Sequence, residues 1–273
     1  MPNLEVLWLF GNSLTGNIPD EFASMSNLLV LDLSDNKLEG GLPVSLSTVE
    51  TLLILNLGNN NFGGQIPVEF GNLVNLGNLN LENSGLSGTI PSAVAALESL
   101  AVLRLSNNNF DSAPIPSFLY FMMQLKELRL DNCNLIGGLD ANIGNLKNLR
   151  VLSLEGNSLD GPIPNALTTR SPMEVLRLGG NAFGGPFTGF LENEVLREID
   201  LSDNNIVLGE IPDFSMFPNI EKMELRDCGI SGNLADSIAS LENLRTYHYH
   251  QNLFHELTPA YKFFRFIHCT RMA

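Results

Sequence analysis

A motif of the form L-x-x-L-x-L-x-x-N-x-L returns about every 24 residues along most of this chain, and no other feature limits the possible folds as strongly. Ten full copies are followed by a truncated eleventh that ends near Phe254. The copies begin at Leu4, Leu28, Leu52, Leu76, Leu100, Leu125, Leu149, Met173, Leu196, Ile220 and Leu244. A single unit of this length cannot bury its own apolar residues, so the period predicts a stack of units that bury them against one another.

Each unit contains one short strand whose side chains alternate between two environments. In residues 103–105, for example, the two leucines are expected in the core and Arg104 on the outer face. The asparagine that follows is expected to turn inward and bind backbone groups that would otherwise be buried without partners. Ser84, Cys133 and Cys228 replace it in three units. We expect both cysteines to be buried and reduced, and to lie four strands apart, beyond the reach of a disulfide.

The second half of many units carries the motif G-x-I-P, as at residues 16–19 and 88–91. Glycine permits a left-handed backbone there, and proline ends regular strand pairing. Short amphipathic pieces such as residues 92–97 are then expected on the convex side.

Together, the leucine pattern and G-x-I-P resemble the plant-type leucine-rich repeat over residues 1–254. The resemblance implies an α/β solenoid, a right-handed superhelix with a parallel concave β-sheet. Residues 255–273 form a non-repeat tail that either folds over the open end as a cap or is a flexible end or the product of a faulty gene prediction.

The family resemblance also implies a class of function. The family includes the ectodomains of receptor-like kinases and receptor-like proteins, and polygalacturonase-inhibiting proteins, which bind peptides, co-receptors or other proteins. We therefore expect a non-catalytic scaffold that binds a protein or peptide ligand on its concave face. The alternative is a soluble inhibitor of a secreted hydrolase. The sequence contains no nucleophile elbow, phosphate-binding glycine loop, zinc-protease motif or kinase signature, so it predicts neither an enzyme nor a cofactor.

Composition narrows the expected partners. Fifteen lysines and arginines against 30 acidic residues give a formal net charge of −15, which repels nucleic acids and anionic membranes. No apolar run approaches the roughly 18 residues of a membrane helix, so we expect no membrane insertion. The first residues lack the basic segment and cleavage site of a secretory leader, and no asparagine belongs to a glycosylation sequon. Localisation is therefore left open, although the resemblance implies an extracellular or plasma-membrane ectodomain if the N-terminus is incomplete.

The repeat register identifies the side chains on the outer face of the sheet. Between the two core positions of successive strands stand Trp8, Asp32, Asn56, Asn80, Arg104, Arg129, Ser153, Arg177, Asp200, Glu224 and His248. Arg104 and Arg129 are expected on adjacent strands about 4.8 Å apart, with Arg177 two strands beyond. Guanidinium groups bind carboxylates with two hydrogen bonds, so this arginine stripe is a candidate site for an acidic ligand group. Alternatively, neighbouring carboxylates neutralise the arginines as a solvated charge ladder. Those carboxylates are Glu127, Asp131 and Glu155.

Two further candidate sites lie at the ends of the repeat array. Trp8 and Phe10 are expected to be exposed on the first strand, either as binding residues or in contact with a missing N-terminal repeat or cap. His248 and His250 share one face of the last strand, with His255 nearby in sequence. Their spacing matches no strong zinc motif, so a surface pair is favoured over a metal site and no metal is expected.

Overall fold

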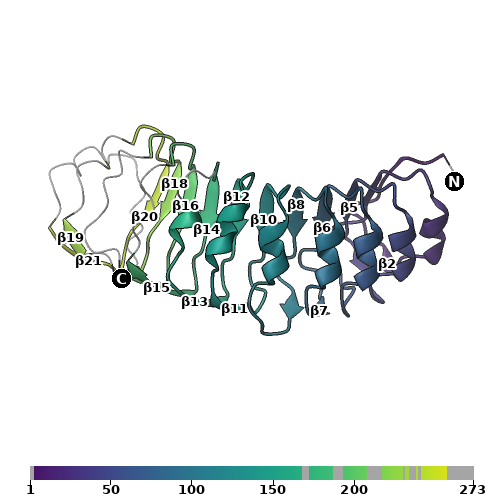
Figure 1. Ribbon diagram of the computed structural model, residues 1–273, viewed down its shortest axis with the longest axis horizontal. Coiled ribbons are helices and arrows are strands. Elements are labelled where there is room, and N and C mark those ends of the chain that lie inside the picture. Colours follow the sequence, from purple (N-terminus) through teal and green to yellow (C-terminus); the bar gives the residue numbers. More distant parts are fainter. Residues whose placement is uncertain are drawn as a thin grey trace. The chain divides into compact units, whose positions relative to one another are not determined.

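The computed structural model describes residues 3–167, 172–186, 193–207, 217–229, 231–233, 238 and 241–256. They divide into two compact units. Unit 1 extends to Gly137 and includes Asn145–Leu149, whereas unit 2 contains Gly138–Gly144 and continues from Arg150. Within each unit the polypeptide repeats one turn, and the successive strands stack side by side (Figure 1).

The main sheet of each unit consists of three-residue strands, one from each repeat. In unit 1 their order is β1 (Val6–Trp8), β3 (Val30–Asp32), β5 (Ile54–Asn56), β6 (Asn78–Asn80), β8 (Val102–Arg104) and β10 (Glu127–Arg129). In unit 2 it is β12 (Val151–Ser153), β14 (Val175–Arg177), β16 (Glu198–Asp200), β18 (Lys222–Glu224) and β20 (Thr246–His248). The pairing within each unit is parallel and in register, as in Leu31↔Leu55 and Leu176↔Ile199. The structure thus confirms the predicted parallel sheet.

The central residue of each strand points into the core. Leu31, Leu55, Leu79 and Leu103 have no exposed surface. The first repeat differs, because its leucines at positions 4, 7 and 9 are only half-buried and Leu14 is exposed. The reason is that β1 pairs on one side only, with β3, within the part of the chain that the structure describes.

Buried asparagines link successive turns, as the sequence predicts. The Asn60 amide donates to the carbonyl oxygens of Leu33, Leu57 and Gly58 at 3.0–3.2 Å, and its oxygen accepts from the Leu38 N–H at 3.0 Å. Asn36, Asn108, Asn181 and Asn204 repeat this arrangement. Each amide therefore satisfies backbone groups of two turns that have no access to water.

Cysteine and serine make part of the same contacts where they replace asparagine. The Cys228 thiol lies 3.1 Å from the carbonyl oxygen of Leu201, and the Ser84 hydroxyl lies 3.3 Å from that of Leu57. Cys133 and Cys228 are buried and not joined in a disulfide, as predicted, and burial raises the pKa of each thiol to about 12.

The residue before the inward-facing asparagine, or before the serine or cysteine that replaces it, adopts a left-handed backbone in repeat after repeat, a requirement that the repeat pattern alone does not reveal. Asp35, Asn59, Asn83, Asn107 and Asn132 have φ values of 49–59°. Glycines occupy the position in other repeats, at 11, 156 and 180, with φ values of 64–67°. Only glycine and short side chains that can hydrogen-bond locally visit this region readily, which explains the Gly, Asn and Asp that recur there.

The rest of each turn contains short strands and 3₁₀-helices. The short strands are β2 (Thr15–Gly16), β4 (Lys37–Leu38), β7 (Ser87–Gly88), β9 (Asn109–Phe110), β11 (Ile136–Gly138), β13 (Ser158–Gly161), β15 (Ala182–Pro186), β17 (Asn205–Val207), β19 (Ser231–Asn233) and β21 (Leu253–Glu256). The 3₁₀-helices are η1 (Asp20–Ser24), η2 (Val44–Thr48), η3 (Val68–Asn72), η4 (Ser92–Ala96), η5 (Ser117–Phe121), η6 (Ala141–Asn145) and η7 (Asn165–Leu167). Proline precedes η1 to η5 directly, so its fixed φ begins the helix as well as ending strand pairing. The tail from residue 257 lies outside the described residues.

Candidate functional site

Unit 1 carries a three-residue charge cluster on the outer face of its sheet, the face opposite the core. Arg104 of β8 lies beside Arg129 of β10, as the register predicts. Glu127, at the start of β10, accepts two hydrogen bonds from Arg104, from Nε at 2.8 Å and from Nη2 at 3.1 Å. Nε of Arg129 donates to the same carboxylate. Two guanidinium groups therefore share one carboxylate, and these three residues carry a net charge of +1.

These ion pairs are partly buried, so salt screens them less than it screens pairs on an open surface. The side chains of Arg104, Arg129 and Glu127 are 35%, 27% and 14% exposed. Burial alone would raise the pKa of Glu127, but hydrogen bonds from Arg104 and Arg129 outweigh it and lower that pKa. The hydrogen bond to Glu127 raises the pKa of Arg104. The mutual contacts therefore favour the charged forms of Glu127 and Arg104.

The other two carboxylates predicted to lie near the arginines belong to different units: Asp131 to unit 1 and Glu155 to unit 2. The Asp131 carboxylate accepts a hydrogen bond from the Ser106 hydroxyl at 2.8 Å, and that hydroxyl accepts from the Asp131 N–H at 3.1 Å. Glu155 is half-buried in unit 2. The carboxylate that contacts both Arg104 and Arg129 is that of Glu127. Glu127 lies two residues before Arg129, on the same face of β10.

Arg177 belongs to a longer and more evenly balanced series of ion pairs in unit 2. Glu198 accepts hydrogen bonds from Arg177, at 2.8 and 3.1 Å, and from Lys222 at 2.9 Å. Lys222 also contacts Glu224 at 2.8 Å, and Nδ1 of His248 lies 3.5 Å from the same glutamate. Burial opposes the ionisation of Glu198, Glu224 and Lys222, yet their mutual contacts lower the pKa of both glutamates and raise that of the lysine.

The sequence could have revealed Glu198 and Lys222 as the partners in this series. Both occupy the first position of their strands, which lies on the outer face together with the third position. The outer-face residues assigned from the sequence are those between the two core positions, so they do not include these first-position residues.

The structure corrects one sequence expectation on this face. The repeat register predicts an exposed Ser153, but this residue is fully buried. It lies opposite Arg177 in the register of β12 and β14. A serine side chain is short, so atoms of neighbouring residues can cover it completely, whereas a longer side chain at the same position would extend into water.

Trp8 and Phe10 are exposed, as predicted, with 65% and 54% of their surface accessible. The ring centroids of His248 and His250 are 6.5 Å apart in an edge-on arrangement. No group of three or more His, Cys, Asp or Glu residues able to hold a metal ion is found among the described residues. The helices in the described ranges are also too short or too polar to span a membrane.

The fold and its repeating turn define a leucine-rich repeat protein of the plant type. The sequence profile described as "Leucine-rich repeat region" matches residues 6–177, and one described as "Leucine Rich Repeat" matches residues 195–216. The chain belongs to the leucine-rich repeat family. No curated protein sequence matches it.

Several solved structures of receptor ectodomains are similar to this chain. The Arabidopsis receptor kinase HAESA, in complex with the peptide hormone IDA and the co-receptor SERK1, matches with 34% identity and a TM-score of 0.87 over 93% of this chain and 43% of that one. A TDR receptor matches with 29% identity and a TM-score of 0.87 over 93% and 44%. GASSHO1/SCHENGEN3 from Arabidopsis thaliana, in complex with CASPARIAN STRIP INTEGRITY FACTOR 2, matches with 28% identity and a TM-score of 0.71 over 93% and 36%. The chain thus spans less than half the length of each of these three.

Proposed function

We propose that this protein is a non-catalytic recognition module that binds a peptide or protein ligand on the outer face of its sheet, the face that the sequence predicts to be concave. The similar receptor structures include one in complex with a peptide hormone and a co-receptor. Because this chain spans less than half of those ectodomains, the likeness supports the class of ligand and no individual hormone.

The observation that carries the proposal is the excess positive charge of the Arg104–Glu127–Arg129 cluster. One carboxylate cannot neutralise two guanidinium groups, so the cluster can accept a second carboxylate from a ligand. The positive charge is uncommon on a chain of net charge −15. A ligand that covers the cluster would remove water from it, which strengthens a charged hydrogen bond well beyond the value of an exposed ion pair.

The ligand chemistry that fits is an acidic side chain or a free C-terminal carboxylate. Arg177 is a weaker candidate than Arg104 and Arg129, because Glu198, Lys222 and Glu224 continue its ion pair with alternating charge. Asp131, also in unit 1, would favour a ligand with a basic group near its carboxylate, whereas Glu155 is a separate candidate in unit 2. Trp8 and Phe10 offer exposed aromatic surface for apolar ligand residues.

A display selection of random short peptides with free C-termini tests the proposal, with each selected peptide resynthesised in free and amidated form. We expect Arg129→Ala to weaken binding by roughly 1.5–3 kcal/mol, the contribution of a hydrogen bond to a charged group. Arg129→Lys should restore only part of this loss, since an ammonium lacks the planar fork of donors. Arg197→Ala is the matched control, because Arg197 is 62% exposed and lies outside the cluster.

Selected peptides that bind without regard to Arg104, Arg129 and Arg177 would place the ligand elsewhere, with Trp8 and Phe10 the next residues to replace. An assay of pectin-degrading enzymes in the presence of the protein separates the receptor-like function from the inhibitor alternative. Inhibition of such an enzyme, with no peptide selected, would overturn the peptide proposal.

A further inference from the structure

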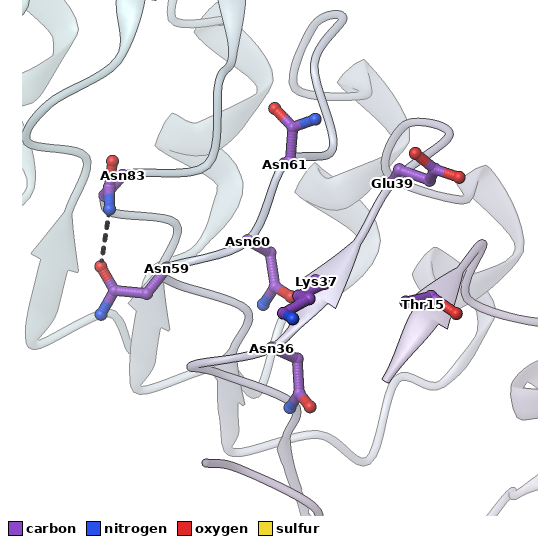
Figure 2. A pocket seen from close by; sticks show the side chains of 8 residues that line it. All are labelled: Thr15, Asn36, Lys37, Glu39, Asn59, Asn60, Asn61 and Asn83. Atoms are coloured by element: carbon purple, nitrogen blue, oxygen red, sulfur yellow. Dashed lines mark hydrogen bonds between the residues drawn. The ribbon is translucent and has the colours of Figure 1, made fainter. Parts of the chain in front are cut away.

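We propose that unit 1 contains a second binding site, for a neutral carbohydrate, in a polar hollow beside the short strands β2 and β4. The hollow has a volume of about 520 Å³, within the range of roughly 300–1,000 Å³ found for small-molecule sites. Figure 2 shows Thr15 and Lys37 on the two strands, Glu39 just after β4, and a run of asparagines on the adjoining loop. The outer sheet face of the peptide proposal contributes none of the residues that line it.

Strand pairing and the repeat register bring these side chains together. Thr15 lies opposite Lys37 in the parallel pair β2 and β4. Asn61 occupies the position of Lys37 one repeat later, and its N–H donates to the Leu38 carbonyl at 2.8 Å. Thr15 and Glu39 likewise occupy equivalent positions of successive repeats. In the following repeat, Gly63 takes the place of Glu39 and Gly85 takes the place of Asn61, so no side chain fills the space between the turns there. The hollow is therefore a consequence of two glycines that follow two polar residues.

Several polar groups at the hollow are not used by the fold. Lys37 and Glu39 are exposed, and neither forms an ion pair within residues 3–167. Thr15 and Asn61 are also exposed, and their side chains form no hydrogen bond with other residues in that range. By contrast, Asn36 and Asn60 are engaged with the backbone. The hollow therefore offers a ligand four polar groups: an ammonium, a carboxylate, a hydroxyl and a carboxamide.

The asparagine turns form an ordered side of the hollow. The Asn83 amide donates to the Asn59 oxygen at 3.0 Å, and the Asn59 amide donates to the Asp35 carboxylate at 3.0 Å (Figure 2 shows the first contact). The left-handed backbone of both asparagines fixes the base of these side chains. Pre-ordered groups reduce the entropy lost when a ligand binds.

The donor and acceptor set fits a ligand rich in hydroxyl groups. A hydroxyl both donates and accepts, and it matches a carboxamide or a threonine hydroxyl, which do the same. The hydroxyls of a sugar can donate to Glu39 and accept from Lys37. The opposite charges of these two residues cancel, so neither an anionic nor a cationic ligand gains from the site as a whole. No aromatic or aliphatic side chain lines the hollow, which disfavours nucleotides and apolar peptide side chains.

Calorimetric titration of the folded chain with cellotetraose and xylotetraose tests the proposal, with trigalacturonate as the anionic comparison. We expect one of the neutral oligosaccharides to bind more tightly than trigalacturonate. Glu39→Gln and Asn61→Ala should each weaken that binding by about tenfold, the effect of one lost charged or well-ordered hydrogen bond. Side-chain amide NMR signals of Asn61 and Asn59 should shift on addition of the sugar in the unaltered protein.

Asp111→Asn is the matched control for Glu39→Gln, because Asp111 occupies the same register position three repeats later and is exposed outside the hollow. Binding that is lost equally in this control, no binding of either neutral oligosaccharide, or tighter binding of trigalacturonate would each overturn the proposal. Arg129→Ala should leave sugar binding unchanged, so the outcome is independent of the peptide proposal. Melting temperatures of the variants confirm that all of them are folded.

Discussion

The Cys133 thiol lies 3.3 Å from the carbonyl oxygen of Leu105, where the amide of an asparagine stands in neighbouring repeats. Asn108, one repeat earlier, donates to the carbonyl of Leu81 at 2.8 Å from the equivalent place. The Cys133 thiol also lies 3.4 Å from the Asp131 carbonyl, just as the Asn108 amide lies 3.4 Å from the Ser106 carbonyl. Cysteine therefore preserves the inward-facing donor at this position, although a thiol donates more weakly than an amide.

Burial of the two thiols predicts slow chemical modification. Desolvation raises the pKa of both Cys133 and Cys228 to about 12, so almost no thiolate is present at pH 8. We expect a disulfide-exchange reagent to label them in the native protein far more slowly than in urea. Rapid labelling of both thiols before unfolding would contradict their burial.

The asparagine contacts predict that alanine substitution at two adjacent positions, Asn60 and Asn61, changes the unfolding free energy by different amounts. Asn60→Ala removes three donated hydrogen bonds and one accepted from Leu38, and it should cost about 1–3 kcal/mol of unfolding free energy. Asn61→Ala changes an exposed side chain of the same type and should alter stability by less than about 0.5 kcal/mol. Urea denaturation of both variants measures the difference, and equal losses would show that the inward asparagine is not structural.

The core leucines predict a larger effect. Leu152 has no exposed surface, so Leu152→Ala should leave a cavity and cost about 2–5 kcal/mol. The neighbouring Ser153 is itself buried and is therefore an unsuitable control. Ser158→Ala, at an exposed position of the same repeat, should change the unfolding free energy little. Similar urea midpoints for the two variants would mean that the repeat register is wrong.

The lowered pKa of Glu127 predicts a pH-dependent contribution to stability. A carboxylate with a lowered pKa in the folded state stabilises the protein above its ordinary pKa of 4.5, and this stabilisation is lost as the pH falls through the lower folded value. Glu127→Gln should therefore be less stable than the unaltered protein at pH 7, and the difference should shrink below pH 4.5.

Unfolding free energies between pH 3 and pH 7 measure this dependence. Glu98→Gln is the control, because Glu98 is exposed and makes no side-chain contact in the part of unit 1 that the structure describes. A stability difference for Glu127→Gln that stays constant across this range would contradict the ionic role of the carboxylate.

The repeat period determined much of the fold from the sequence alone. Because alternate positions of a strand face opposite sides, the register assigned Leu103 to the core and Arg104 to the outer face without reference to the structure. The same register placed Arg104 beside Arg129 and turned Asn60 inward. These features depend on local periodicity, which a single chain displays directly.

Other features depend on contacts between repeats, and only the tertiary structure decided them. Glu127 contacts both arginines because its long side chain reaches Arg104 on the neighbouring strand β8 as well as Arg129 on its own strand. The sequence does not specify the rotamer that allows this. Ser153 is buried because its neighbours are larger than it is. In the polar hollow, Gly63 takes the place of Glu39 and Gly85 takes the place of Asn61 one repeat later, and only the stacking of turns brings these positions side by side. The sequence thus determined which face each side chain occupies, whereas packing between turns decided which side chains meet.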